Sequence, residues 1–160
     1  MILHTTARCI THPPCEWTGT TDKSAEKHGR ETGHATIVET IPMRAPRRIQ
    51  MSRKHPWRAD NPDAVIVARP SRWGNPFEIG STRWIPVDEN GTWSKEPHPP
   101  LTREQAVECF RLSAVFDARE FPGYYAALAG RDLACWCALV DADGNPVPCH
   151  ADVLLELANE

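Results

Sequence analysis

The sequence predicts a small α/β domain preceded by a short, metal-stabilised module. Apolar runs at residues 64–68 and 133–137 have the length and composition of buried parallel strands, and stretches with helical periodicity alternate with them. The spacing of two cysteines and two histidines near the amino terminus predicts the module. At 160 residues, the chain has the length of one ordinary domain with a small module attached.

Composition and charge narrow the class of protein. No stretch approaches the roughly 18 apolar residues of a membrane span, and residues 1–6 lack the features of a signal peptide, so we expect a cytoplasmic protein. Six cysteines in such a protein indicate thiols or metal ligands more than disulfides. Residues 44–72 carry eight basic and two acidic side chains, which suits a phosphate-bearing partner or, equally, a solvated surface.

The first module, residues 1–35, resembles a C2H2 zinc finger. Two thiolates and two imidazoles are the donors of a closed tetrahedral zinc site, and so short a segment needs such a staple to fold. His4 and His12 could substitute as ligands. We expect one Zn²⁺ here, and its four ligands follow the spacing C-x5-C-x12-H-x5-H, which places them at Cys9, Cys15, His28 and His34.

Residues 24–32 form the predicted helix of this module. Two histidines six residues apart do not share a face of a regular helix, so Gly33 is expected to end it and let His34 turn back. Gly19 stands where such fingers usually carry a large apolar core residue, and Trp17 could fill the gap.

Residues 36–47 are interpreted as a stiff basic connector because prolines and arginines follow one another at its end, with a short strand at residues 37–41 as the alternative. One finger covers about three base pairs and would not select a DNA site alone, so non-specific nucleic-acid contact, or a protein contact, is expected. The side chains expected to make this contact are Lys27, Arg47, Arg48, Arg53 and Lys54.

The second domain, residues 48–160, is expected to be a small Rossmann-like domain of three layers with a mostly parallel sheet. Thr102 and Gln105 form a capping box that starts a helix, and Asn90 with Gly91 predicts a hairpin turn outside the sheet. In order, the expected elements are strands at 48–51 and 64–68, the hairpin turn, helices starting at 102 and spanning 122–130, a strand at 133–137 and a helix at 151–159.

Two loops of this domain are expected to face each other. The first, residues 69–77, follows one predicted strand, and the second follows the strand at 133–137 and ends just before the last helix. The carboxyl ends of parallel strands meet at one edge of a sheet, where open α/β sheets bind ligands. The ligand-binding residues predicted on the first loop are Arg69, Ser71, Arg72, Trp73, Gly74 and Asn75.

The first loop carries groups that suit a nucleotide-like ligand. The guanidinium forks of Arg69 and Arg72 suit phosphate oxygens, and Gly74 permits close backbone approach. Asn75 could donate to a carbonyl or a base edge. Trp73 offers a stacking face for a base, or else anchors the loop in the core.

The second loop carries the candidate catalytic residues. At a helix start, Cys149 could be a thiolate nucleophile or a metal ligand, and His150 or Asp152 could exchange protons; a helix cap with a buried thiol is the alternative. Cys135 and Cys137 are two apart on a strand and share a face. With Cys149 and His150 they could form a second zinc site, and two core cysteines are the competing interpretation.

Four stretches of the second domain occur in an order that resembles one known family. They are Arg-Ile-Gln at residues 48–50, ARPSRWGNPF at 68–77, GRDLACWC at 130–137 and CHADVLLELA at 149–158. The family is a domain family of unknown function, widespread in bacteriophages and bacterial genomes. The resemblance implies architecture and motif positions but no reaction, and the finger ahead of it is similar to modules fused to it in phages of actinobacteria.

These observations predict a zinc-binding accessory protein of phage type, located in the host cytoplasm if a phage encodes it. It is expected to bind nucleic acid or a nucleotide-like phosphate ligand, and catalysis on nucleotides or DNA, such as glycosidic or phosphoryl chemistry, is left open. The alternative is a non-catalytic adaptor that binds a host protein through Trp84 and Trp93.

Overall fold

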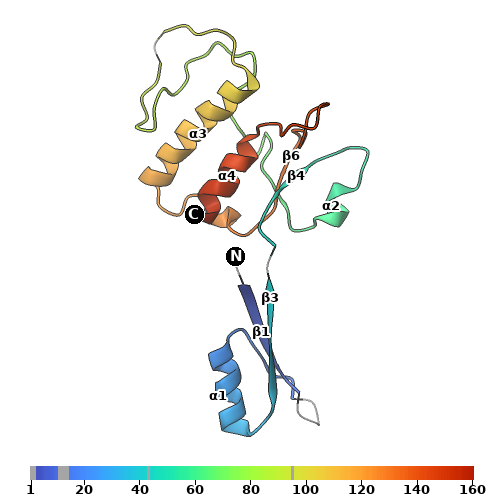
Figure 1. The fold of residues 1–160 in the computed structure, drawn as a ribbon. Helices are drawn as coiled ribbons and strands as arrows, with labels where there is room; N and C mark the ends of the chain where they lie inside the picture. The colour runs from blue at the N-terminus through green and yellow to red at the C-terminus, as the bar shows by residue number, and fades with distance from the viewer. Residues whose placement is uncertain (1–2, 11–14, 43, 95) are drawn as a thin grey trace. The chain divides into compact units, whose positions relative to one another are not determined.

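The chain folds into two compact units, Met1–Ala45 and Pro46–Glu160, in the computed structural model drawn in Figure 1. The structure describes residues 3–10, 15–42, 44–94 and 96–160. Among these residues, no helix combines the length and the apolar character that crossing a lipid bilayer would require.

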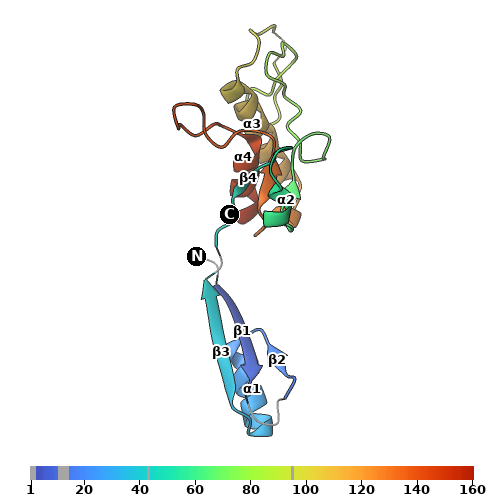
Figure 2. The same cartoon turned by 90° about the vertical axis from the view of Figure 1, so that its right-hand side faces the viewer.

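The first unit consists of a three-stranded antiparallel sheet and one helix. The strands are β1 (Leu3–Cys9), β2 (Thr18–Gly19) and β3 (Thr36–Pro42), in the order β2-β1-β3. Helix α1 (Asp22–Thr32) packs on β1 and β3, as Figure 2 shows.

Both ends of α1 have a local cause in the sequence. Thr21 caps the amino end, where its side-chain oxygen accepts a hydrogen bond from the Ser24 backbone N–H. At the other end, Gly33 adopts a left-handed conformation (φ +71°), and its N–H bonds to the Gly29 carbonyl. The predicted helix and its end at Gly33 are confirmed.

The predicted connector at residues 36–47 is wrong over most of its length. Residues 36–42 form β3, which pairs with β1 at every position from Leu3 opposite Pro42 to Cys9 opposite Thr36. Five of these seven residues are β-branched, which favours a strand. Pro42, which has no N–H to donate, is the last residue of β3, and β3 is an edge strand of the sheet, where proline is tolerated. The basic connection therefore covers only the few residues between Pro42 and Arg48.

The second unit contains a three-stranded parallel sheet. Strand β6 (Leu133–Cys135) lies in the middle, between β4 (Arg48–Gln50) and β5 (Val65–Ile66). All three strands lie where the sequence predicts them, and they are shorter than predicted. The unit is thus a small α/β domain with a parallel sheet, and a Rossmann-like arrangement in three layers stays a prediction.

Four helical segments accompany this sheet: α2 (Trp57–Asp60), α3 (Arg103–Glu120), the 3₁₀ segment η1 (Ala126–Leu128) and α4 (His150–Asn159). The predicted capping box opens α3, where Thr102 and Gln105 exchange hydrogen bonds. Figure 1 shows α3 and α4 side by side, and α4 also packs on β6 and β4. The amino end of α4 therefore lies at the sheet.

The predicted helix at residues 122–130 is wrong. Gly123 adopts a left-handed conformation (φ +81°), which interrupts a helix after its first residues. A turn closed by the Tyr124 N–H and the Phe121 carbonyl is followed by the short η1 segment.

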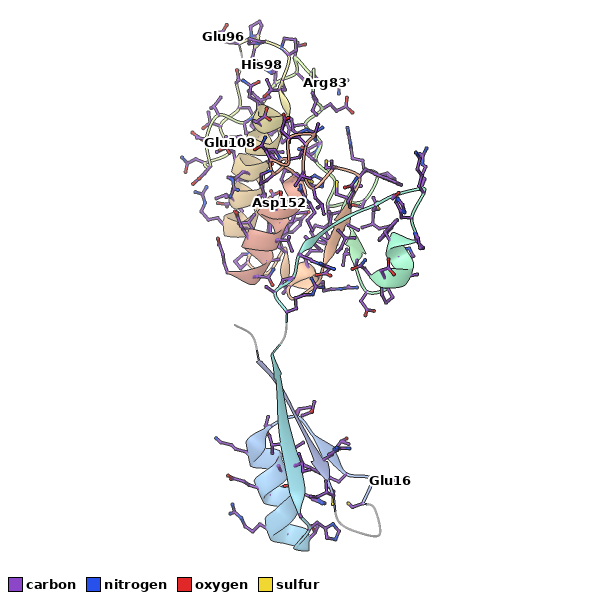
Figure 3. All side chains as sticks on the ribbon, turned by 45° about the vertical axis from the view of Figure 1, so that its right-hand side comes forward. Glu16, Arg83, Glu96, His98, Glu108 and Asp152 are labelled. Carbon is purple, nitrogen blue, oxygen red and sulfur yellow. The ribbon has the colours of Figure 1, made fainter. Side chains whose placement is uncertain are left out.

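The predicted turn at Asn90–Gly91 is confirmed. The Val87 N–H bonds to the Thr92 carbonyl at 2.9 Å, and Pro86 pairs antiparallel with Trp93. Figure 3 shows Arg83, Glu96 and His98 at the far end of the same excursion, away from Asp152 on α4.

The central strand of the second unit provides a test of this core. Leu133 is fully buried on β6, so Leu133→Ala should lower the free energy of unfolding by about 3 kcal/mol because it removes packed atoms and leaves a cavity. Leu139→Ala is the matched control, because Leu139 is 41 % exposed and should change it by less than about 1 kcal/mol. Equilibrium denaturation measures both, and equal effects would contradict the assignment of β6 to the core.

Candidate functional site

The four predicted ligands of the first unit come together in one cluster. Their donor atoms all lie within 4.8 Å of one another, so the cluster could hold a metal ion. The Cys9 Sγ lies 3.6 Å from the His34 Nδ1, and the Cys15 Sγ lies 3.7 Å from the His28 Nε2. The proposed substitutes cannot be compared with them, because His12 and the side chain of His4 lie outside the described residues.

Trp17 supports this cluster in the way the sequence predicts. Its ring stacks on the His28 ring with a centroid distance of 4.4 Å and an angle of 8°. A Cβ at Gly19 would lie 2.6 Å from the Trp17 ring, so this position has to remain a glycine for the indole to fit. Trp17 thus fills the space that a large residue at position 19 would otherwise occupy.

A second cluster forms at the carboxyl end of β6. Cys135, Cys137 and the α4 N-cap residue Cys149 place their sulfur atoms within 4.8 Å of one another, so they too could hold a metal ion. The Sγ atoms of Cys135 and Cys137 are 3.7 Å apart. The predicted fourth ligand does not join them: the His150 Nε2 lies 2.9 Å from the Val67 carbonyl oxygen, and the His150 Nδ1 approaches only Cys149.

The surroundings of Cys149 favour its thiolate. Thiol hydrogen bonds from Cys135 and Cys137 lower the pKa of Cys149 most strongly, and the Ala151 N–H at the start of α4 acts in the same direction. The hydrogen bonds of Cys135 with Cys137 and with Cys149 raise the pKa of Cys135. These contacts therefore favour negative charge on the Cys149 sulfur, although Cys149 is only 1 % exposed.

Two arginines supply positive charge to this cluster. The Arg48 side chain is only 7 % exposed, and it also lowers the pKa of Cys149. Its Nη1 lies 3.1 Å from Asp152, and its Nε has no hydrogen-bond partner among the described residues. From α3, the Arg103 Nη1 donates to the Cys137 Sγ at 3.6 Å.

The burial of Arg48 corrects one predicted nucleic-acid contact. Its Nη2 donates to the carbonyls of Ala138 and Leu139 at 3.3 Å, so the whole guanidinium is held inside the domain. The other four basic residues of that set, Lys27, Arg47, Arg53 and Lys54, are exposed, and their contact with nucleic acid stays a prediction.

The two loops line one pocket of about 360 Å³ next to the cysteine cluster. Residues 68–79 contribute one wall, and residues 135–137 and 148–150 contribute another. Helix α3 closes it with Arg103, Ala106 and Val107. The predicted convergence of the two loops at the end of the parallel strands is thus observed.

The first loop, however, turns only part of its predicted residues toward the pocket. Arg69 and Asn75 line it, and Arg69 pairs with the exposed carboxylate of Glu78. The Asn75 Nδ2 donates to the Ala106 carbonyl at 3.0 Å, and its Oδ1 accepts from the Phe77 N–H at 2.8 Å. Asn75 therefore joins the loop to α3, and Arg69 is the loop's charged group at the pocket.

Trp73 and Arg72 lie outside this pocket. Trp73 is 8 % exposed and packs against Tyr124 and Tyr125, so it is a core anchor, which was the alternative interpretation. The Arg72 guanidinium lies 4.0 Å from the centroid of the Trp73 ring. Neither side chain is placed to contact a ligand beside the cysteines.

Two smaller residues of the loop also have structural surroundings. A Cβ at Gly74 would come within 2.9 Å of the Arg69 backbone nitrogen, so the close approach is to the loop's own backbone. The Ser71 Oγ is buried, and it has no hydrogen-bond partner among the described residues.

The predicted proton donor Asp152 lies outside the pocket lining as well. Burial raises its pKa, and its ion pair with Arg48 acts in the opposite direction. Burial also lowers the pKa of His150, which lines the pocket. Among the described residues that line the pocket, none is a carboxylate.

The sequence interpretation missed Trp136 and Arg103 as pocket residues. Trp136 is 50 % exposed, lines the pocket and lies within 5.6 Å of the Arg53 guanidinium. Its position between Cys135 and Cys137 was the available signal. In an extended segment, two cysteines that share one face leave the side chain between them on the opposite face, where it can be exposed.

Replacing Arg48 tests whether the cluster depends on this guanidinium. Arg48→Gln should lower the free energy of unfolding by about 2 kcal/mol because it leaves the half-buried Asp152 without its cation and removes one of the two guanidinium groups beside the cysteines. Arg47→Gln is the control, because the Arg47 side chain is 61 % exposed and its ion pair with Asp132 is long, at 3.9 Å. Urea denaturation measures the free energy of unfolding of both variants. Equal decreases would contradict a stabilising role of the Arg48 guanidinium in the cluster.

The comparisons with known proteins identify the family of the second domain. No curated protein and no solved structure matches the chain. The family described as Domain of unknown function (DUF4326) matches residues 49–160, well over half of the chain, and the finger-like unit lies ahead of that match. The chain therefore belongs to the DUF4326 family.

Proposed function

We propose that this protein holds zinc in both of its cysteine clusters and that its α/β domain binds a phosphate-bearing, nucleotide-like ligand. The observation that carries this proposal is the convergence of both loops, three cysteines and two arginines on one pocket. A pocket of about 360 Å³ is in the size range of small-molecule sites.

The distances within the clusters support zinc. With Zn–S bonds of about 2.3 Å and Zn–N bonds of about 2.0 Å, neighbouring ligand atoms of a tetrahedral site lie about 3.5–3.8 Å apart. The S···N distances of 3.6 and 3.7 Å in the first cluster match this geometry, as does the S···S distance of 3.7 Å in the second. A single ion fits each cluster, and a reducing cytoplasm would keep these thiols available as ligands.

The walls of the pocket support a phosphate-bearing ligand. Arg69 and Arg103 present guanidinium groups to the pocket. One guanidinium can donate two parallel hydrogen bonds to two oxygens of the same phosphate. Trp136 offers an exposed ring on which a base can stack, and Arg53 lies close to that ring. A nucleotide within a nucleic-acid strand presents the same groups as a free one, and exposed Arg47, Arg53 and Lys54 would favour the strand.

The second candidate function is the adaptor. Trp84 is 68 % exposed and Trp93 is 47 % exposed on the excursion that precedes α3, although Trp93 also packs against Phe77. Exposed tryptophans are typical anchors of protein interfaces. An accessory protein of phage type could use them to bind a host protein.

Metal content tests the first part of the proposal. The full-length protein should contain two equivalents of zinc, and Cys9→Ser and Cys137→Ser should each contain one. Cys109→Ser is the control: Cys109 is buried and belongs to neither cluster, so two equivalents should remain. Elemental analysis after gel filtration measures this, and two equivalents in Cys137→Ser would contradict a second site.

Ligand binding tests the second part. Adenosine monophosphate and inorganic phosphate should raise the melting temperature and bind in calorimetry, and Arg69→Gln should weaken this binding about tenfold because a charge-assisted hydrogen bond is lost. Arg72→Gln is the matched control, since Arg72 stacks on Trp73 outside the pocket. A protein that responds to neither phosphate compound would contradict the proposal and favour the adaptor.

A further inference from the structure

The cluster of the α/β domain lacks one ligand. Cys135, Cys137 and Cys149 supply three sulfur atoms, and the described residues bring no fourth donor within 4.8 Å of all three. The His150 Nδ1 lies 3.7 Å from the Cys149 Sγ, but no His150 ring nitrogen lies within 4.8 Å of all three sulfur atoms, and the Nε2 contacts the Val67 carbonyl oxygen. Structural zinc sites are closed by four protein ligands, whereas zinc that binds a substrate keeps one position open.

The missing position faces the pocket. Cys135, Cys137 and Cys149 all line it, together with the charged side chains of Arg69 and Arg103. The cluster of the first unit differs, because Cys9, Cys15, His28 and His34 already provide four donors. Within the described part of the chain, the cluster beside the pocket is therefore the one that combines three cysteine ligands with room for a small molecule.

The ligands already present argue against water as the working fourth ligand. Three thiolates outweigh the charge of Zn²⁺ and weaken its pull on a bound water. The pocket lining described above contains no carboxylate to take a proton, and Glu78 and Asp152 pair with Arg69 and Arg48 instead. Hydrolysis by a zinc-bound water is thus poorly supported.

A sulfur donor fits this position better. Zinc commonly takes four thiolates, and soft ligands such as thiolates prefer to share a metal with one another. The added negative charge would meet two guanidinium groups, the buried Arg48 with its unpartnered Nε and Arg103 at the Cys137 Sγ. Arg69 in the pocket wall contacts the exposed carboxylate of Glu78 through its Nη1, and its other N–H groups can pair with an acidic group on the same ligand.

We propose that the open position binds the thiol of a small anionic molecule. The S–H bond breaks, a zinc–sulfur bond forms, and the proton leaves to solvent, with no change in oxidation state. This inference rests on the proposed zinc site and specifies its ligand: the anion that Arg69 holds also carries a thiol. Zinc binding would hold that thiol as a thiolate, which is its nucleophilic form.

Cobalt spectroscopy on the full-length chain tests this directly. With Co²⁺ in both clusters, mercaptoacetate should add sulfur-to-cobalt charge-transfer absorption in the near ultraviolet and release one proton for each molecule bound. Hydroxyacetate, which differs only in carrying oxygen for sulfur, should do neither. The first cluster should contribute a constant background because its four positions are filled.

Variants assign the response to this cluster. Cys137→Ser should abolish the response to mercaptoacetate, and Arg69→Gln should weaken it about tenfold while leaving the cobalt content unchanged. Arg72→Gln, outside the pocket, should bind mercaptoacetate like the unaltered protein.

Three results would overturn the proposal: equal spectral changes with mercaptoacetate and hydroxyacetate, no change with mercaptoacetate while cobalt is retained, or removal of the cobalt by mercaptoacetate. Binding of adenosine monophosphate that depends on Arg69, found together with any of these, would leave the proposed function standing and reject only the thiol. Absence of metal from Cys135, Cys137 and Cys149 would reject the second zinc site and the thiol together, and binding of adenosine monophosphate would then decide the phosphate part of the proposed function alone.

Discussion

The close approach of three cysteine sulfur atoms is the constraint on which the candidate site of the α/β domain depends. Where two such sulfur atoms are both thiolates, two unit charges about 4 Å apart repel by about 4 kcal/mol even at an effective dielectric constant of about 20. The Sγ atoms of Cys135 and Cys137 are 3.7 Å apart, and Cys149 is almost fully buried beside them. Arg48 from β4 and Arg103 from α3 place guanidinium groups beside these sulfur atoms, which favours negative charge on them.

The elements that build the core also build the cluster. Strand β6 ends at Cys135, α4 begins after Cys149, β4 contributes Arg48 and α3 contributes Arg103. The parallel order β4-β6-β5 is what brings these segments to one end of the sheet. The candidate site therefore lies on well-buried elements, because all three residues of β6 and Cys149 at the start of α4 are buried.

The features that depend on contacts between residues close in the chain could be predicted from the sequence. The capping box of α3, the end of α1 at Gly33 and the ligands of the first cluster all follow from residues near one another in the chain or from a known ligand spacing. The features that the sequence analysis got wrong depend on pairing between segments that are distant in the chain. Strand β3 exists because β1 lies beside it, and Arg48 is buried because β4 joins β6. The charge and proline content of these segments does not reveal that they pair as strands. The residue type alone likewise does not distinguish Trp73, which lies in the core, from Trp136, which is exposed.

The segment between Cys137 and Cys149 is anchored at both ends by the same cluster. Within it, Asp141 closes its own turn by accepting hydrogen bonds from the Asp143 and Asn145 N–H groups. Closure entropy rises only slowly with loop length, so a segment pinned in this way can gain or lose residues at little cost. Evolution could thus redesign this strip of surface, including what it recognises, without disturbing the sulfur atoms beneath it.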